Sequence, residues 1–76
     1  MTELEWLDIF ADNLASMMEE GGYTQMDLAE ETGLSQSTIS AYLNKRKLPG
    51  VKAIINIAYA LDCEVTELID FDETIE

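Results

Sequence analysis

Histidine is absent from this chain, and cysteine and proline each occur once. A single thiol, Cys63, cannot form an internal disulfide, and without histidine the usual zinc ligand sets cannot be assembled. The N-terminal stretch MTELEW lacks the basic segment of a signal peptide, and no apolar run reaches the roughly 20 residues that cross a bilayer. We therefore expect no metal site, no cofactor, no contact with a membrane and a location in the reducing cytoplasm.

Glycine and the residue patterns of strands are also scarce. The 76 residues include four glycines, and they show little of the Val, Thr and aromatic alternation that strands require. Stretches rich in Ala, Leu, Glu, Met and Gln favour helices instead. The length fits one domain with a modest core and is too short for a second domain with a cleft between the two. We therefore expect an all-α domain over residues 1–70 and a frayed tail over residues 71–76.

Basic residues are few and unevenly placed. Lys and Arg number four against sixteen Asp and Glu, which gives a formal net charge of −12. All four bases lie between residues 32 and 61, where no acid occurs, and three of them are adjacent at residues 45–47. Because the Debye length is about 8 Å at physiological salt, this segment is partly insulated from acids on the far side of the domain. It forms either a local positive surface or a loop of solvated charges.

Capping signals divide the chain into five predicted helices. The first follows Thr2, which forms a capping-box pattern with Glu5, and it ends at GGY, residues 21–23. The second follows the cap Thr24 and ends at Thr32 and Gly33. The third follows the cap Ser35, the fourth follows Pro49 and Gly50 and ends at Asp62, and a short fifth helix comes next.

Apolar spacing predicts which side of each helix faces the core. The predicted inward residues are Leu4, Leu7, Phe10, Leu14, Met17 and Met18, then Leu28 and Ala29, then Ile39, Tyr42 and Leu43, then Val51, Ile54, Ile55, Ala58 and Leu61, and finally Val65, Leu68 and Ile69. Cys63 and Tyr59 are also predicted to be core residues.

The second and third predicted helices are joined by a very short turn that contains Gly33. Helices joined in this way cross steeply, which is the spacing of a helix-turn-helix unit. On a helical wheel, Ser37, Ala41 and Asn44 lie opposite the apolar side of the third helix. A solvated face usually carries Glu and Lys, so this small and uncharged face is predicted to approach another surface.

The stretch YTQMDLAEETGLSQSTISAYLNKRKLPGVKAIINIAYALDCEVTELID resembles the Cro/C1-type (XRE-family) helix-turn-helix domains of phage repressors and related bacterial regulators. The resemblance covers about Trp6 to Ile69 and rests on the TQ, LA, TGLSQSTIS and later LP, IA and EL elements in register. It implies a five-helix lambda-repressor-like fold. It also implies a transcriptional regulator, a repressor, that binds a short palindromic operator in double-stranded DNA as a homodimer.

The resemblance also implies a DNA-contact site around the third helix. Gln36, Ser37 and Ala41 fall at family positions that meet base edges, with Ser40 and Asn44 close by. Their chemistry suits the role, because a Gln amide can bond adenine in the major groove and an Ala methyl can contact the thymine methyl. The residues implied to contact the DNA backbone are Gln25, Ser35, Thr38, Asn44, Lys45, Arg46 and Lys47.

Two positions depart from the family pattern, since Lys45 and Asp62 stand where glycine is common. The Lys45 departure leaves open how Arg46 and Lys47 are posed. Dimer contacts are expected either from the C-terminal part, around Val65, Leu68, Ile69 and Phe71, or from Trp6 and Phe10.

An alternative function is a protein-interaction module, antitoxin-like or antirepressor-like, whose acidic surface binds a basic partner. The sixteen acids and the apolar residues Trp6, Ile9 and Phe10 motivate it, although acids also serve solubility. An enzyme has the least support, because adjacent Glu30 and Glu31 point to different faces and Cys63 has no histidine to activate it. We expect no catalytic residues.

Overall fold

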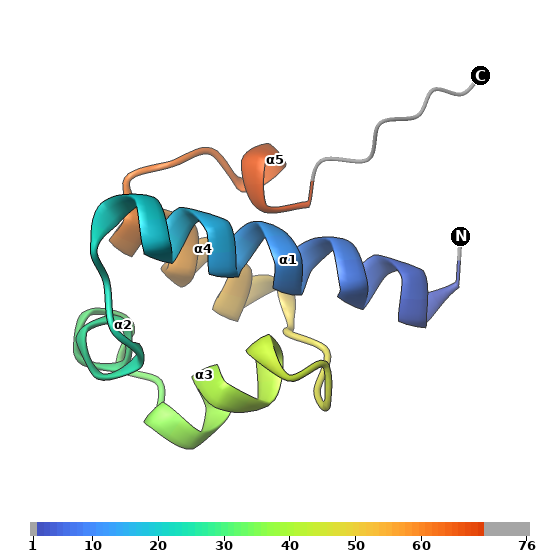
Figure 1. The fold of residues 1–76 in the computed structure, drawn as a ribbon, viewed down its shortest axis with the longest axis horizontal. Coiled ribbons are helices and arrows are strands. Elements are labelled where there is room, and N and C mark those ends of the chain that lie inside the picture. Colours follow the sequence, from blue (N-terminus) through green and yellow to red (C-terminus); the bar gives the residue numbers. More distant parts are fainter. Residues whose placement is uncertain (1, 70–76) are drawn as a thin grey trace.

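A computed structural model describes residues 2–69, and within that range the chain forms five α-helices and no strand (Figure 1). The helices are α1 (Glu3–Gly21), α2 (Gln25–Thr32), α3 (Gln36–Leu43), α4 (Val51–Leu61) and α5 (Val65–Leu68). The predicted all-α class and the order of the helices are confirmed. The predicted tail and the two end residues of the predicted domain, residues 1 and 70, lie outside the described residues. Among the helices described, none is long and apolar enough to cross a membrane.

Side-chain caps fix where the first three helices begin. The hydroxyls of Thr2, Thr24 and Ser35 accept hydrogen bonds from the backbone N–H three residues later, at 3.2, 3.0 and 3.1 Å. In α1 and α2 the cap is reciprocal, because the carboxylates of Glu5 and Asp27 accept from the backbone N–H of the capping threonine. All three predicted caps are therefore present.

Left-handed residues end three of the helices. Gly22 and Gly33 follow α1 and α2 with φ of 74° and 79°, a conformation that glycine adopts without a steric penalty. Asp62 follows α4 with φ of 56°, so an aspartate occupies the left-handed position where the family commonly has glycine.

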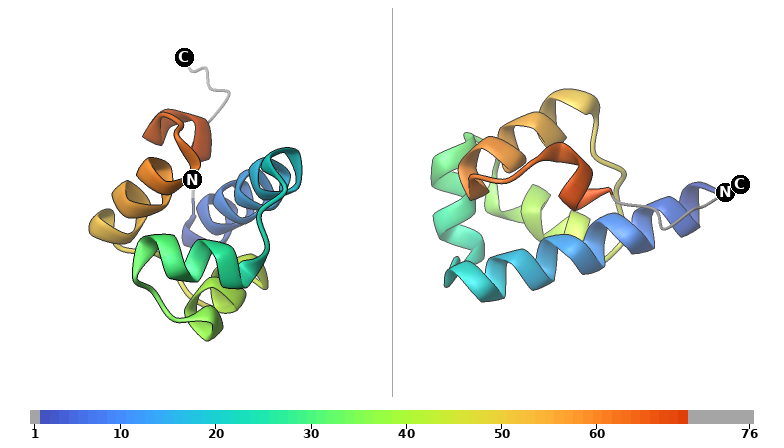
Figure 2. Two further views of the ribbon diagram at one scale, coloured as in Figure 1. Left: turned by 90° about the vertical axis from the view of Figure 1, so that its left-hand side faces the viewer. Right: turned by 90° about the horizontal axis from the view of Figure 1, so that it is seen from above.

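The core lies between α1 and the other helices. α1 packs against α3, α4 and α5, and α2 packs against α3 and α4, as the views in Figure 2 show. Phe10 is completely buried, with its ring stacked on Trp6 at 5.8 Å between centroids and edge-on to Tyr42 at 5.9 Å. The fully buried large side chains are Phe10, Leu14, Leu28, Ile39, Ile57 and Leu68.

Four residues predicted to lie in the core are exposed instead. Leu4 is 73% exposed, and on α4 the exposed fractions of Val51, Ile55 and Tyr59 are 74, 51 and 89%. The true inward residue of α4 that the prediction omitted is Ile57, which is fully buried. The α4 sequence VKAIINIAYAL is apolar on most of its circumference, so apolar spacing alone could not identify which side meets α1 and α2.

Cys63 is half-buried beside the core rather than fully buried. Burial raises the pKa of its thiol, and the nearby carboxylates of Glu67, Asp62 and Glu64 raise it further. A thiol in these surroundings stays protonated and is a weak nucleophile.

Two side-chain hydrogen bonds join distant parts of the chain. The Asn13 side-chain amide donates to the carbonyl oxygen of Leu68 at 2.9 Å and thus ties α1 to the end of α5. The Tyr23 hydroxyl donates to the carbonyl oxygen of Ala60 at 3.1 Å and ties the start of α2 to α4.

Candidate nucleic-acid interface

The turn between α2 and α3 is held by backbone and side-chain bonds. The Thr32 hydroxyl donates to the carbonyl oxygen of Leu28 at 2.7 Å and accepts from the backbone N–H of Leu34 at 3.2 Å. Gly33 supplies the left-handed residue between them. These contacts set α3 at a fixed angle to α2, as a helix-turn-helix unit requires.

α3 buries one side and exposes the other. Ile39 and Tyr42 are buried against α1 and α2, and the burial of Tyr42 raises the pKa of its phenol. The structure brings together on one side of α3 the residues predicted to meet base edges. Gln36 and Ser37 are exposed in the first turn of α3, and Ser40 and Ala41 are half-buried one turn later. Within residues 2–69, the side-chain amide of Gln36 forms no hydrogen bond, so its donors and acceptor are available to a ligand.

Hydroxyl groups are already linked at the start of α3. The Ser35 hydroxyl lies 2.8 Å from the Thr38 hydroxyl, to which it donates, and 3.3 Å from that of Ser37. Together with the Ser35 cap, these bonds hold three of the predicted contact residues in one arrangement. A ligand would meet side chains that are already ordered.

Asn44 has a structural role at the other end of α3. Its side-chain amide donates to the carbonyl oxygen of Ser40 at 2.9 Å and to the Ser40 hydroxyl at 3.1 Å. Both amide hydrogens are therefore used within the helix end. The hydroxyl of Ser40 accepts one of these bonds and keeps its own hydrogen for an external acceptor.

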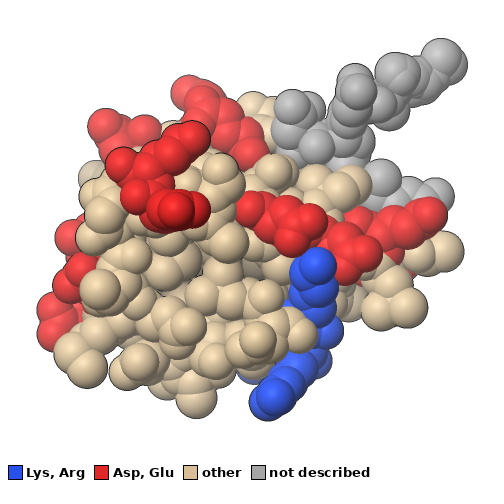
Figure 3. Space-filling model, viewed as in Figure 1, with Lys and Arg blue, Asp and Glu red and all other residues tan. Residues whose placement is uncertain are grey.

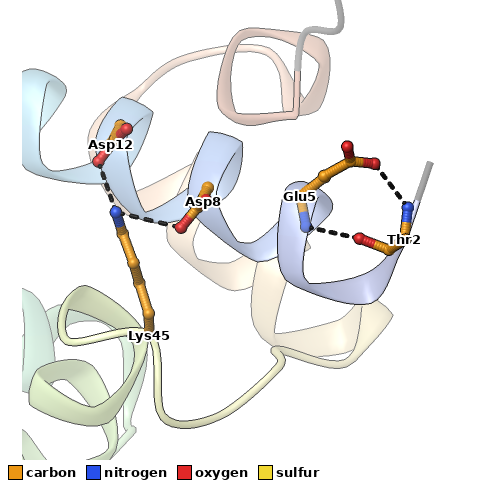
Figure 4. Close-up of polar contacts among 5 residues, drawn as sticks. All are labelled: Thr2, Glu5, Asp8, Asp12 and Lys45. Atoms are coloured by element: carbon orange, nitrogen blue, oxygen red, sulfur yellow. Dashed lines mark hydrogen bonds and ion pairs between the residues drawn. The ribbon is translucent and has the colours of Figure 1, made fainter.

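Lys45 adopts a left-handed conformation, with φ of 62°, immediately after Asn44, the residue that caps the end of α3. A glycine would adopt this conformation readily, which agrees with glycine being common here in the family that the sequence resembles. The Lys45 Nζ lies 3.2 Å from Asp8 Oδ1 and 3.3 Å from Asp12 Oδ1, both on α1 (Figure 4). Hydrogen bonds to Asp8 and then Asp12 raise the pKa of Lys45.

The three adjacent bases therefore differ in their surroundings. Within the described range, Lys45 is the only base that forms ion pairs, and its ammonium lies against the acids of α1. Arg46 and Lys47 are exposed and unpaired there. Sequence reasoning did not identify Asp8 and Asp12 as partners of Lys45. The only signal available was that both lie one turn apart on the same face of α1.

Acids and bases are separated on the molecular surface. Figure 3 shows Asp and Glu over the upper part of the molecule, where α1 lies, and down its left side beside α2, with Lys and Arg at the right-hand end of the lower part, where α3 lies. The surface around α3 in this view is otherwise uncharged. Gln25 is half-buried as the first residue of α2, the helix that packs against α3.

Comparisons with known proteins give the same picture of the fold. A family model described as helix-turn-helix matches residues 14–68. The restriction-modification controller protein C.AhdI from Aeromonas hydrophila is similar in structure, with a TM-score of 0.79 and 29% sequence identity over 82% of this chain and 94% of that chain. The hypothetical transcription factor NHTF from Neisseria is similar in fold, with a TM-score of 0.81 and 24% identity over 91% of this chain and 80% of that chain. No match was found among curated protein sequences.

Proposed function

The chain belongs to the XRE-type helix-turn-helix family of DNA-binding transcriptional regulators, and from this premise we propose that it is a repressor that reads a short palindromic operator as a homodimer. In this proposal α3 enters the major groove and the start of α2 lies against the DNA backbone. The similarity to a restriction-modification controller protein supports a regulatory role.

The observation that carries the proposal is the outward face of α3. On a chain with sixteen acids, this helix has none, and its exposed side chains are polar and uncharged. Phosphates repel carboxylates, so a duplex can approach this protein closely only at a face without acids. Arg46 and Lys47 lie directly beyond the end of that face and supply the positive charge.

We assign base-edge contacts to Gln36, Ser37 and Ala41, with the Ser40 hydroxyl close by. The proposed phosphate contacts come from Gln25, Ser35, Thr38, Asn44, Lys45, Arg46 and Lys47. Several of these already have partners in the structure, because Lys45 is paired with Asp8 and Asp12, Asn44 is bonded to Ser40, and the Ser35 hydroxyl is bonded to Thr38. We therefore expect Arg46 and Lys47 to provide most of the charge-dependent affinity.

The test is in vitro selection from random duplex DNA with the purified protein at moderate salt, followed by sequencing of the bound pool. The expected result is an enriched inverted repeat whose half-sites are about one helical turn apart. Enrichment of asymmetric single sites would remove the dimer from the proposal. A pool that stays random would overturn sequence-specific binding.

The separation of charge favours one alternative, a module that binds a basic protein through its acidic surface. α1 and α2 carry nine acids between residues 3 and 31 and no base, and Figure 3 shows many of them away from α3. Affinity purification from the native host that recovers no protein partner would count against this alternative. A random pool in the DNA selection would favour it.

A further inference from the structure

Three large side chains form an exposed apolar stripe along one flank of α4. Val51, Ile55 and Tyr59 are spaced four residues apart and are 74, 51 and 89% exposed. The same helix buries Ile54, Ile57 and Ala58 in the core. The stripe is therefore a second apolar surface of α4. No other part of residues 2–69 covers it in the monomer.

We propose that this α4 stripe is the contact surface for a second copy of the chain, packed with the two α4 helices antiparallel about a two-fold axis near Ile55. Ile55 then meets the partner's Ile55, and Val51 meets the partner's Tyr59. A two-fold contact of this kind uses the same patch on both copies. The inference deepens the proposed function, because it rests on the proposed homodimer and says where its interface lies.

Charge favours a second copy at α4. Each copy carries a net charge of −12, so two copies repel one another over most of their surfaces. α4 contains no acid, and its one charged residue is Lys52. In the antiparallel arrangement, Lys52 near the start of α4 lies beside the end of the other α4, where the partner's Asp62 and the partner's Glu64 follow. The contact thus joins the copies where repulsion is least and opposite charges approach.

The position of α4 leaves the DNA-facing helix uncovered. α3 packs against α1 and α2, and it does not pack against α4. The end-on view in Figure 2 shows α1 and α4 on opposite sides of the molecule with α3 below them. A second copy seated on α4 can therefore leave α3 of each copy free to contact a duplex.

The size of the stripe predicts a weak dimer. A standard stable interface buries about 800 Å² per partner, and three side chains fall short of that. Tyrosine is enriched among the residues that dominate binding energy, which makes Tyr59 the main anchor. We expect a monomer–dimer equilibrium at micromolar concentrations that operator DNA shifts toward the dimer.

The residues expected from the sequence to form the dimer contact are mostly buried or half-buried in the structure. Phe10 and Leu68 are fully buried in the core, so neither can meet a partner without unfolding. Trp6, Val65 and Ile69 are half-buried against the core, and Phe71 lies outside the described residues. Among residues 2–69, none of these expected contact residues is as exposed as the three residues of the α4 stripe.

The first test measures the mass of the full chain by analytical ultracentrifugation without DNA over a wide concentration range. The wild-type chain should reach the dimer mass, and Ile55→Glu should remain a monomer at concentrations where the wild type is mostly dimeric. The matched control is Leu4→Glu, which places the same charge at another exposed apolar residue and should leave the dimer intact. Circular dichroism melts show that each variant is folded.

The second test locates the axis by cross-linking. In a Cys63→Ala background, Ile55→Cys should form a covalent dimer with a short bis-maleimide reagent, whereas Leu4→Cys should not. A folded Ile55→Glu chain that still dimerises would place the interface elsewhere and overturn the inference, while the DNA selection would decide the proposed function separately. A wild-type chain that is monomeric at all concentrations would also overturn it. If the wild-type chain were monomeric and Ile55→Glu made residues 70–76 more sensitive to protease, we would conclude that this segment of the same chain, and not a second copy, covers the α4 stripe.

Discussion

Side chains along α3 and directly after it are proposed to divide between reading bases and holding phosphates. Gln36→Ala should relax preference at one base step, which costs about 1–3 kcal/mol of discrimination. Arg46→Ala with Lys47→Ala should instead weaken binding to all sequences and reduce the salt slope by roughly one unit for each phosphate that the variant no longer neutralises. Both effects are measured by titrating selected and scrambled duplexes at several salt concentrations.

The control for the double substitution is Ala15→Glu with Ser16→Glu on the exposed part of α1. It changes the net charge by the same amount, at a place away from α3. If it weakened binding as much as the loss of Arg46 and Lys47, the total charge would matter and the local positive surface would not.

Lys45 combines an unfavourable backbone conformation with two favourable ion pairs. Both glycine and alanine at this position remove the contacts to Asp8 and Asp12. Glycine relieves the strain of the left-handed backbone, whereas alanine retains it. Lys45→Gly should therefore melt higher than Lys45→Ala by about 4–8 °C for each kcal/mol of left-handed strain in a domain of this size, and that strain is about 1–2 kcal/mol for alanine. Equal melting temperatures would mean that the turn relaxes when the lysine is removed.

The pairing of Lys45 also has a defined pH dependence. Its pKa in the folded protein is raised, so the stabilisation is complete below the ordinary value of 10.5 and is lost as pH rises through the folded value. The stability difference between the wild type and Lys45→Gly, measured by denaturation at a series of pH values, should therefore be constant from neutral pH to about pH 10.5 and should change above that value.

At the scale of helices, each side-chain cap predicts how much stability the protein loses when the capping residue is replaced. Thr24→Ala removes the hydroxyl that accepts from the Asp27 N–H at the start of α2, and it should cost about 1 kcal/mol. Thr66→Ala is the matched control, since Thr66 is exposed on α5 and caps no helix. Chemical denaturation measures both, and an equal loss in the two variants would show that the Thr24 cap contributes nothing specific.

The contribution of Asp27 to the stability of the same cap depends on pH. Hydrogen bonds from Thr24, first its backbone and then its side chain, lower the pKa of Asp27. The contribution is therefore present above the ordinary value of 3.8 and is lost as pH falls through the lower folded value. The stability difference between the wild type and Asp27→Asn should be constant near neutral pH and shrink as pH falls below 3.8.

Local signals explain why the helices could be predicted from the sequence. Thr2, Thr24, Ser35 and the glycines after α1 and α2 act over three or four residues, so their effects can be read from neighbouring letters. The burial of α4 depends on where α1 and α2 lie, and no local pattern contains that information. The same limit hid the pairing of Lys45, because its acid partners on α1 are distant in the chain.

Over the whole molecule, the distribution of charge should govern binding to unselected DNA. Asp8→Asn with Asp12→Asn removes two negative charges and releases Lys45 from its partners. Glu19→Gln with Glu20→Gln removes the same number of charges at exposed positions of α1 that are not paired with a base within the described residues. The two variants therefore have equal net charge. The first should bind random duplex DNA several-fold more tightly than the second at low salt, and equal binding would show that Lys45 is already available to phosphates.

The contact between α1 and α5 determines when this chain can first fold during its synthesis. The bond from Asn13 to Leu68 spans 55 residues, and Leu68 is completely buried. The first helix therefore emerges from the ribosome long before the residues that complete its core are made. A prematurely ended product without α5 would lack part of that core and should be degraded as an unfolded chain, so incomplete synthesis should not produce a fragment that competes with the full chain for DNA.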